Sequence, residues 1–206
     1  MSERKAQLER KSKETEITGI LNIDGTGQSK IKTQIGILDH MLELFTFHGF
    51  FDLNLQVSKA DLEIDIHHTN EDIGIVLGKI FKKALGEMQG IKRFGSGFSP
   101  MEATLGHTVI DISGRSYLKL QIGNPGEKLP HIKDQENYSM KYLEHFLESF
   151  ANGLGATINI KIDNPDEDLH TNIETVFKSL GQALDQATQI DPRRQGTVPS
   201  TKGIID

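Results

Sequence analysis

Two short stretches of the chain carry histidine and glutamate at spacings that suit metal binding. Residues 65–72 read DIHHTNED and residues 168–174 read DLHTNIE, so threonine replaces one histidine in the second copy. In a helix, residues three or four apart are neighbours, which places each histidine beside the following glutamate. Adjacent residues diverge by about 100° around a helix, so His67 and His68 suit two neighbouring ions better than one. Imidazole and carboxylate donors without sulfur suit manganese, iron, nickel or zinc.

A further histidine lies upstream of each stretch, and a longer comparison indicates an internal duplication. Residues 37–57 and 142–162 both contain an acid, a histidine and apolar residues, then a helical apolar pattern, a glycine and an alternating segment. The donors that recur in the two copies are His40 with His145, His67 with His170, and Glu71 with Glu174. We therefore predict two metal ions, each bound by residues of both copies. The predicted half-repeats span 1–95 and 96–206, the second ending in a basic tail.

The periods of the apolar residues indicate the elements that must position these donors. Apolar residues recur at helical spacing in 38–45, 73–84, 143–150 and 176–184. Alternation predicts strands at 16–24, 53–57, 62–66, 107–113 and 157–162. Such helices bury their apolar stripes against a sheet. We therefore expect an α+β fold, a tandem duplication of a strand-rich α/β unit in which each half is a four-stranded sheet with two helices on one face.

Helix capping is the alternative explanation of the repeated stretches. Thr69 with Asp72, and Thr171 with Glu174, fit the Thr-x-x-acid capping box, in which the threonine side chain accepts a hydrogen bond at a helix start. Capping and metal binding are compatible, because different side chains can serve the two purposes. Repetition of the whole pattern favours metal binding.

The composition is that of an ordinary soluble globular protein, and it excludes several kinds of site. Apolar residues make up 36% and charged residues 25% of the chain. The net charge of −6 argues against general binding to nucleic acid or to acidic membranes. The absence of cysteine excludes disulfides, thiolate metal sites and cysteine nucleophiles. The charged start is no signal peptide and no apolar run is long enough to span a membrane, so we expect a cytoplasmic protein.

Basic and hydroxyl residues at a few positions are candidates for binding an anionic group on this acidic chain. Arg93 follows a predicted helix, Arg115 follows a glycine, and Lys178 lies one helical turn after a repeated glutamate. Ser200 and Lys202 lie in the segment VPSTKG. Each alone is typical of a protein surface, but together they suit a phosphate group. The chain has no Gly-x-x-x-x-Gly-Lys loop, so nucleotide binding of that type is not indicated.

Six motifs follow one another along the chain: ILDHMLELFTFHG, DIHHTNEDIGIVLG, RFGSGFSPMEA, DISGRSYL, ETVFKSLGQAL and VPSTKG. Together they resemble the imidazoleglycerol-phosphate dehydratase family of histidine biosynthesis. The resemblance implies two related α/β halves, two manganese ions per site, and a large octahedral homo-oligomer with sites at subunit contacts. The implied metal ligands are His40, His67, His68, Glu71, His145, His170 and Glu174. The implied substrate-binding residues are Glu14, His48, Arg93, Arg115, Lys178, Ser200 and Lys202.

The resemblance also implies a reaction, the loss of water from imidazole glycerol phosphate to give imidazole acetol phosphate. The proton that must leave is on a carbon without an adjacent carbonyl, so a base alone would face a very weak acid. Metal ions that hold the ring as imidazolate would help to expel the neighbouring hydroxyl. Glu14 is then the expected acid/base. The phosphate-binding residues would fix the reacting carbon relative to the metals.

Thr171 departs from the family pattern, which has a second histidine at this position. A hydroxyl is a poorer ligand than imidazole for these ions, so we expect weaker binding of one of the two ions. His107 and His131 have no partner in the repeat and are interpreted as ordinary histidines, although His131 is a possible replacement donor. The alternative function is a catalytically altered paralogue that binds a phosphate ligand and keeps one strong metal site.

Overall fold

The computed structural model describes residues 4–63, 65–194 and 196–205. In the first half the elements are β1 (Lys5–Lys11), β2 (Glu16–Asn22), β3 (Ser29–Lys32), α1 (Gly36–His48), β4 (Asp52–Lys59) and α2 (His67–Leu85). In the second half they are β5 (Phe94–Met101), β6 (Thr104–Asp111), β7 (Tyr117–Ile122), α3 (Met140–Leu154), β8 (Thr157–Asp163) and α4 (Leu169–Thr188). A short 3₁₀ helix, Pro192–Arg194, follows. The same order of strands and helices thus occurs twice.

The two halves also have the same sheet topology. The first sheet has the strand order β1-β2-β4-β3 and the second β5-β6-β8-β7. In each sheet the first three strands pair antiparallel, while the fourth pairs parallel to its neighbour. A parallel neighbour needs a crossover connection, and α1 and α3 provide it. The predicted pair of four-stranded sheets is confirmed.

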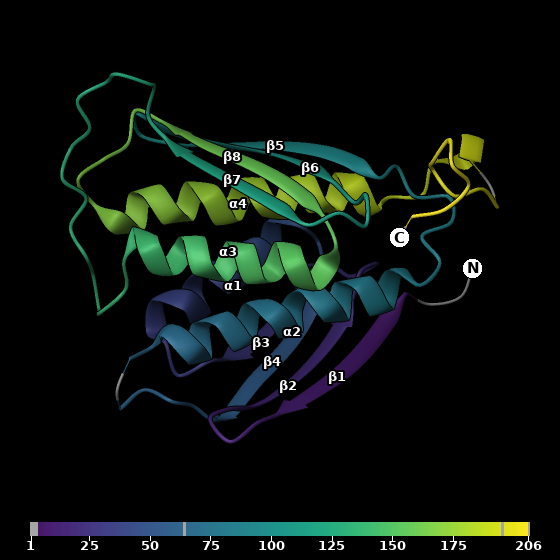
Figure 1. The fold of residues 1–206 in the computed structure, drawn as a ribbon, viewed down its shortest axis with the longest axis horizontal. Helices are drawn as coiled ribbons and strands as arrows, with labels where there is room; N and C mark the ends of the chain where they lie inside the picture. The colour runs from purple at the N-terminus through teal and green to yellow at the C-terminus, as the bar shows by residue number, and fades with distance from the viewer. Residues whose placement is uncertain (1–3, 64, 195, 206) are drawn as a thin grey trace.

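The helices form the middle of the molecule, and the sheets form its two outer layers (Figure 1). Helices α1 and α2 pack on the first sheet, and α3 and α4 pack on the second. The two helix layers pack on each other mainly through α2 with α3 and α1 with α4. Each sheet therefore carries two helices on one face, as predicted. Among the residues that the structure describes, no helix has the length and apolar character needed to cross a membrane.

One hydrophobic core joins the two halves. The rings of Phe45 in α1, Phe81 in α2 and Phe150 in α3 meet edge to face, with centroids 5.9 to 6.3 Å apart. Edge-to-face packing at this separation is favourable beyond the burial of the rings alone. Helices from both halves therefore stabilise each other, while the boundary between residues 95 and 96 stays a prediction.

Helix α4 lies unusually close to the second sheet because β5 presents glycines beneath it. A Cβ atom at Gly95 would lie 1.9 Å from the backbone oxygen of Ala183, and one at Gly97 would lie 2.1 Å from that of Ser179. No side chain fits at these distances. The close contact fixes the position of α4, whose first turns carry two of the predicted metal ligands.

The strand predicted at 62–66 is wrong, because the described residues 62, 63, 65 and 66 lie in no strand. Leu62 and Ile66 are partly buried against the core, which explains their apolar alternation without a strand. The described residues of this segment belong to the connection that leads into α2. It brings Asp61 and Asp65 close to the histidines that start this helix.

Candidate metal centre

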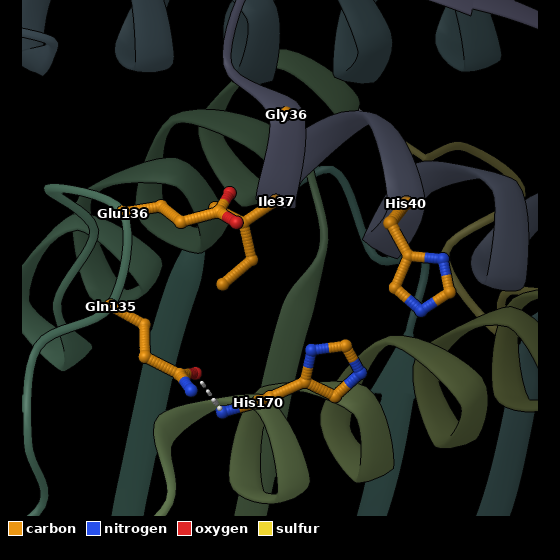
Figure 2. A pocket seen from close by; sticks show the side chains of 6 residues that line it. All are labelled: Gly36, Ile37, His40, Gln135, Glu136 and His170. Carbon is orange, nitrogen blue, oxygen red and sulfur yellow. Dashed lines mark hydrogen bonds between the residues drawn. The ribbon is translucent and has the colours of Figure 1, made fainter.

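His40, His170 and Glu174 form a compact group of ligand atoms between α1 and α4. Their candidate ligand atoms all lie within 4.8 Å of one another. Oε2 of Glu174 lies 2.9 Å from Nε2 of His170 and 3.7 Å from Nε2 of His40. The two imidazole rings lie side by side, with centroids 5.1 Å apart (Figure 2). Nitrogen and carboxylate donors at this separation fit a divalent transition metal.

Charge around this group favours an ionised glutamate. Glu174 is only 8% exposed. Burial alone would raise the pKa of its carboxyl group, but hydrogen bonds and charge from Lys178 and His170 lower it overall. His48, the last residue of α1, has a lowered pKa, caused first by burial and then by the Lys178 ammonium. His48 and Lys178, two predicted substrate-binding residues, therefore lie near this ligand group.

A second group, His67, Glu71 and His145, repeats the arrangement with the roles of the halves exchanged. Nδ1 of His145 in α3 lies 2.8 Å from Nδ1 of His67 at the start of α2. Nε2 of His67 lies 3.5 Å from Oε2 of Glu71, one helical turn later. In each group the histidine of the earlier helix of one half therefore meets the histidine of the other half's later helix, and that histidine lies beside the glutamate one turn later.

His68 makes its polar contacts outside this second group, although its ring lies edge to face against that of His67, with centroids 5.6 Å apart. Its Nδ1 lies 3.0 Å from Oδ2 of Asp61 and 3.8 Å from Oε2 of Glu14, and these three residues form a further group of candidate ligands. The divergence follows from the helix, because neighbouring residues leave it in different directions. Glu14 thus lies beside a predicted metal ligand, as its predicted acid/base role requires. Asp61 was not singled out by its sequence context.

Thr171, the counterpart of His68, bonds to the helix start. Its backbone N–H and its hydroxyl donate to Oδ2 of Asp168, over 3.1 and 3.0 Å. Asp168 is the N-cap of α4, and Ile66 precedes α2 without a side-chain cap. Neither threonine therefore caps its helix, and the capping-box interpretation is wrong. Thr69 instead accepts the backbone N–H of Asp61, 2.9 Å away.

A cavity of about 250 Å³ opens beside the first ligand group. Its lining residues are Gly36, Ile37, His40, Gln135, Glu136 and His170. Figure 2 shows the side chain of Gln135 reaching His170, whose backbone N–H donates to its Oε1 over 3.0 Å. The aperiodic loop sequence gave no signal for Gln135 or Glu136. His131, in the same loop, is exposed and joins neither ligand group described above.

Four of the five predicted phosphate-binding residues, Arg93, Arg115, Ser200 and Lys202, lie toward the other end of α4, whereas Lys178 bonds to Glu174 in the first ligand group. The Arg93 guanidinium donates to both oxygens of Asp111, which raises the pKa of Arg93, and to the backbone oxygen of Pro199. The second contact ties Arg93 to the segment that carries Ser200 and Lys202. Within that segment the Lys202 backbone N–H donates to the Ser200 hydroxyl. Arg115 lies in the exposed turn after β6, the strand that ends at Asp111.

The predicted metal ligand His170 and the predicted phosphate-binding residue Arg93 of one chain are too far apart to share a small ligand. The backbone N–H of Arg93 donates to Ala187 near the end of α4, whereas His170 lies in its first turn. The rise of an α-helix places these two helical positions about 25 Å apart. A ligand that contacts both residues therefore needs them from different chains.

Comparison with known proteins identifies the family. Residues 33–184 match the model of the imidazoleglycerol-phosphate dehydratase family. This chain belongs to that family. Imidazoleglycerol-phosphate dehydratase of Thermoanaerobacter sp. (strain X514) is 46% identical over 202 residues, which cover 98% of this chain and 100% of the relative. The enzyme of Geobacter metallireducens is also 46% identical over 202 residues, covering 98% and 99%.

Solved structures of the same family share the fold. The imidazoleglycerol-phosphate dehydratase of Staphylococcus aureus has a TM-score of 0.76 and 29% identity, covering 91% of this chain and 99% of that one. The Pyrococcus furiosus protein, in complex with (S)-C348, has a TM-score of 0.78 and 34% identity, covering 96% and 99%. The duplicated α+β architecture is therefore that of this dehydratase family.

Proposed function

We propose that this chain catalyses the removal of water from imidazole glycerol phosphate, giving imidazole acetol phosphate in histidine biosynthesis. Family membership over nearly the whole chain supports this carbon–oxygen lyase reaction. The observation that carries the proposal is the convergence of His40, His170 and Glu174 from two halves of the chain. Such a donor set suits binding of an imidazole ring through a metal ion.

The proposed metal ligands are His40, His67, His68, Glu71, His145, His170 and Glu174, with manganese as the proposed ion. Their chemistry fits, because the donors are imidazoles and carboxylates and the chain has no thiol. Metal ions bound there would favour the imidazolate form of the substrate's ring, whose electrons help to expel the neighbouring hydroxyl. Glu14 lies beside His68 and is the proposed acid/base that takes up the proton from the reacting carbon.

Of the predicted phosphate-binding residues, Arg93, Arg115, Ser200 and Lys202 are the proposed anchor. Lys178, predicted with them, bonds to Glu174 and is instead proposed, with His48, to contact the substrate nearer the metal ligands. Guanidinium, ammonium and hydroxyl donors suit the three oxygens of a phosphate ester. An anchored phosphate limits the motion of the reacting carbon relative to Glu14, which lowers the entropic cost of the reaction. Asp111 holds the Arg93 guanidinium in place for this purpose.

The active unit is proposed to be a homo-oligomer, octahedral in symmetry, with each site built at a subunit contact. The distance of about 25 Å along α4 supports this, because one chain cannot bring its own phosphate anchor to its own metal ligands. His68, whose side chain is 49% exposed, is then available to a neighbouring chain. A cytoplasmic location stays a prediction.

The experiment that tests the function combines metal analysis with turnover. Protein purified without chelator and supplied with Mn²⁺ is expected to bind about two ions per chain and to convert imidazole glycerol phosphate to the ketone product. Chelator treatment should abolish turnover, and added Mn²⁺ should restore it. A protein that binds the phosphate compound but binds one ion and shows no turnover would instead be the altered paralogue. Light scattering on the same sample measures the assembly.

A further inference from the structure

Asp61 has no role in the proposed mechanism, yet its side chain contacts the predicted metal ligand His68 directly. Its Oδ2 lies 3.0 Å from Nδ1 of His68. The Asp61 side chain is 22% exposed, whereas that of His68 is 49% exposed. Glu14 lies farther from the same nitrogen, at 3.8 Å, which is beyond hydrogen-bond distance. Asp61 is therefore the carboxylate that bonds the ring, and Glu14 remains free of it.

The backbone of Asp61 is fixed to the same helix turn that carries His68. The backbone N–H of Asp61 donates to Oγ1 of Thr69 over 2.9 Å, and this hydroxyl lies 3.4 Å from the Asp61 carbonyl oxygen. Thr69 is fully buried and follows His68 directly. The loop after β4 is thereby held against the start of α2. The Asp61 backbone is thereby fixed relative to the helix turn that carries His68, which keeps the carboxylate and the imidazole close to each other.

We propose that Asp61 is the positioning residue of the His68 ligand, and this rests on the proposed function of His68 as a metal ligand. Asp61 accepts the hydrogen of Nδ1, so the neutral ring carries its only proton on the side of Asp61. Nε2 is then left unprotonated and can bind a metal ion. A carboxylate behind a histidine ligand fixes its tautomer and ring orientation and increases its basicity.

The second half lacks the histidine of this pair, which supports the assignment. Thr171 stands where His68 stands in the first half, and the nearby Asp168 accepts from its hydroxyl and its backbone. Asp168 therefore serves as a helix cap, while the α2 helix start has no side-chain cap. An aspartate is thus committed to a ring nitrogen only in the half that retains the histidine.

The test is calorimetric titration of the full chain with Mn²⁺, first as the wild type and then as Asp61→Ala and Asp61→Asn. We expect Asp61→Ala to weaken the affected ion by about 10- to 100-fold. The amide oxygen of Asp61→Asn still accepts from Nδ1, so this variant should recover part of the loss. Glu63→Gln is the control, because it removes an exposed carboxylate from the same loop. The visible spectrum of Co²⁺-loaded protein should shift in Asp61→Ala and stay unchanged in Glu63→Gln.

The possible outcomes distinguish a failure of the proposed Asp61 role from a failure of the proposed function. If the wild type binds Mn²⁺ and Asp61→Ala binds it equally well, the proposed role of Asp61 is overturned and the proposed function stays intact. An equal loss in Asp61→Ala and Asp61→Asn, accompanied by a lower melting temperature of the metal-free protein, shows a structural role and overturns it as well. Absence of Mn²⁺ binding by the wild type overturns the proposed function itself.

Discussion

Nδ1 of His145 lies 2.8 Å from Nδ1 of His67, although the two residues belong to different halves of the duplicated chain. Two ring nitrogens at this distance share one hydrogen, so one ring donates and the other accepts. The other donor group joins the halves in the reverse sense, because His40 of the first half contacts His170 and Glu174 of the second. Duplication has thus produced two donor groups that each require both halves, and neither half alone could form one.

Removal of His145 should affect one donor group and leave the other. In His145→Ala, we expect the Mn²⁺ affinity of one ion to fall by more than about 100-fold, because loss of an outer partner alone costs 10- to 100-fold. His40→Ala should weaken the other ion by a similar factor. Titration with Mn²⁺ measures both, and His131→Ala, at an exposed loop position, is the matched control. Loss of both ions in either single variant would contradict the division into two groups.

Thr171→His should raise the affinity for the weaker ion. The change restores the His-His-x-x-Glu pattern that the first half retains. It also breaks the hydrogen bond from the Thr171 hydroxyl to Asp168, at a cost of about 1 kcal/mol in the free energy of unfolding. Metal titration is the measurement, with Thr171→Ser as a control that keeps the hydroxyl. An unchanged titration in Thr171→His, with the fold intact, counts against the ligand assignment.

Much of the fold could be predicted because apolar residues recur along the sequence with the same period as the buried face of each helix or strand. Leu143, Phe146, Leu147 and Phe150 share a helical stripe, and all of them are buried in α3. The wrong strand at 62–66 shows where this reasoning fails. A loop whose apolar residues rest on the core has the same alternation as a strand, and the difference lies in backbone pairing that one segment cannot reveal.

The metal-donor residues of the candidate site could be predicted from the sequence, whereas the residues that hydrogen-bond to them were predicted less well. His40, His67, His145 and His170 recur in the repeat and take part in the two donor groups. Asp61 and Gln135 were missed because their partners, His68 and His170, are reached through loops without periodicity. Contacts of this kind depend on how a loop folds back. Spacing along one sequence carries no record of that geometry.

Alanine at Gly97 should destabilise the protein through α4. The added Cβ would lie 2.1 Å from the backbone oxygen of Ser179, so helix and sheet must separate. Overpacking of this kind typically costs 1 to 3 kcal/mol, and the contact with backbone places the effect at about 3 kcal/mol. Ser96→Ala, on the exposed face of the same strand, should change the free energy of unfolding by less than about 0.5 kcal/mol. Urea unfolding of the metal-free protein gives both values.

Two inactive variants should restore activity when they are assembled together. Glu14→Gln removes the proposed acid/base near His68, and Arg93→Ala removes a phosphate contact near the far end of α4. Because these residues lie at opposite ends of the chain's helix layer, a site at a subunit contact takes them from different chains. Mixed assemblies, prepared by co-expression, then contain some sites with neither substitution, and for random pairing about a quarter of the sites should be intact. Each variant alone should show almost no turnover of imidazole glycerol phosphate. Mixed assemblies as inactive as the single variants would show that one chain supplies both residues, contrary to a site built at a subunit contact.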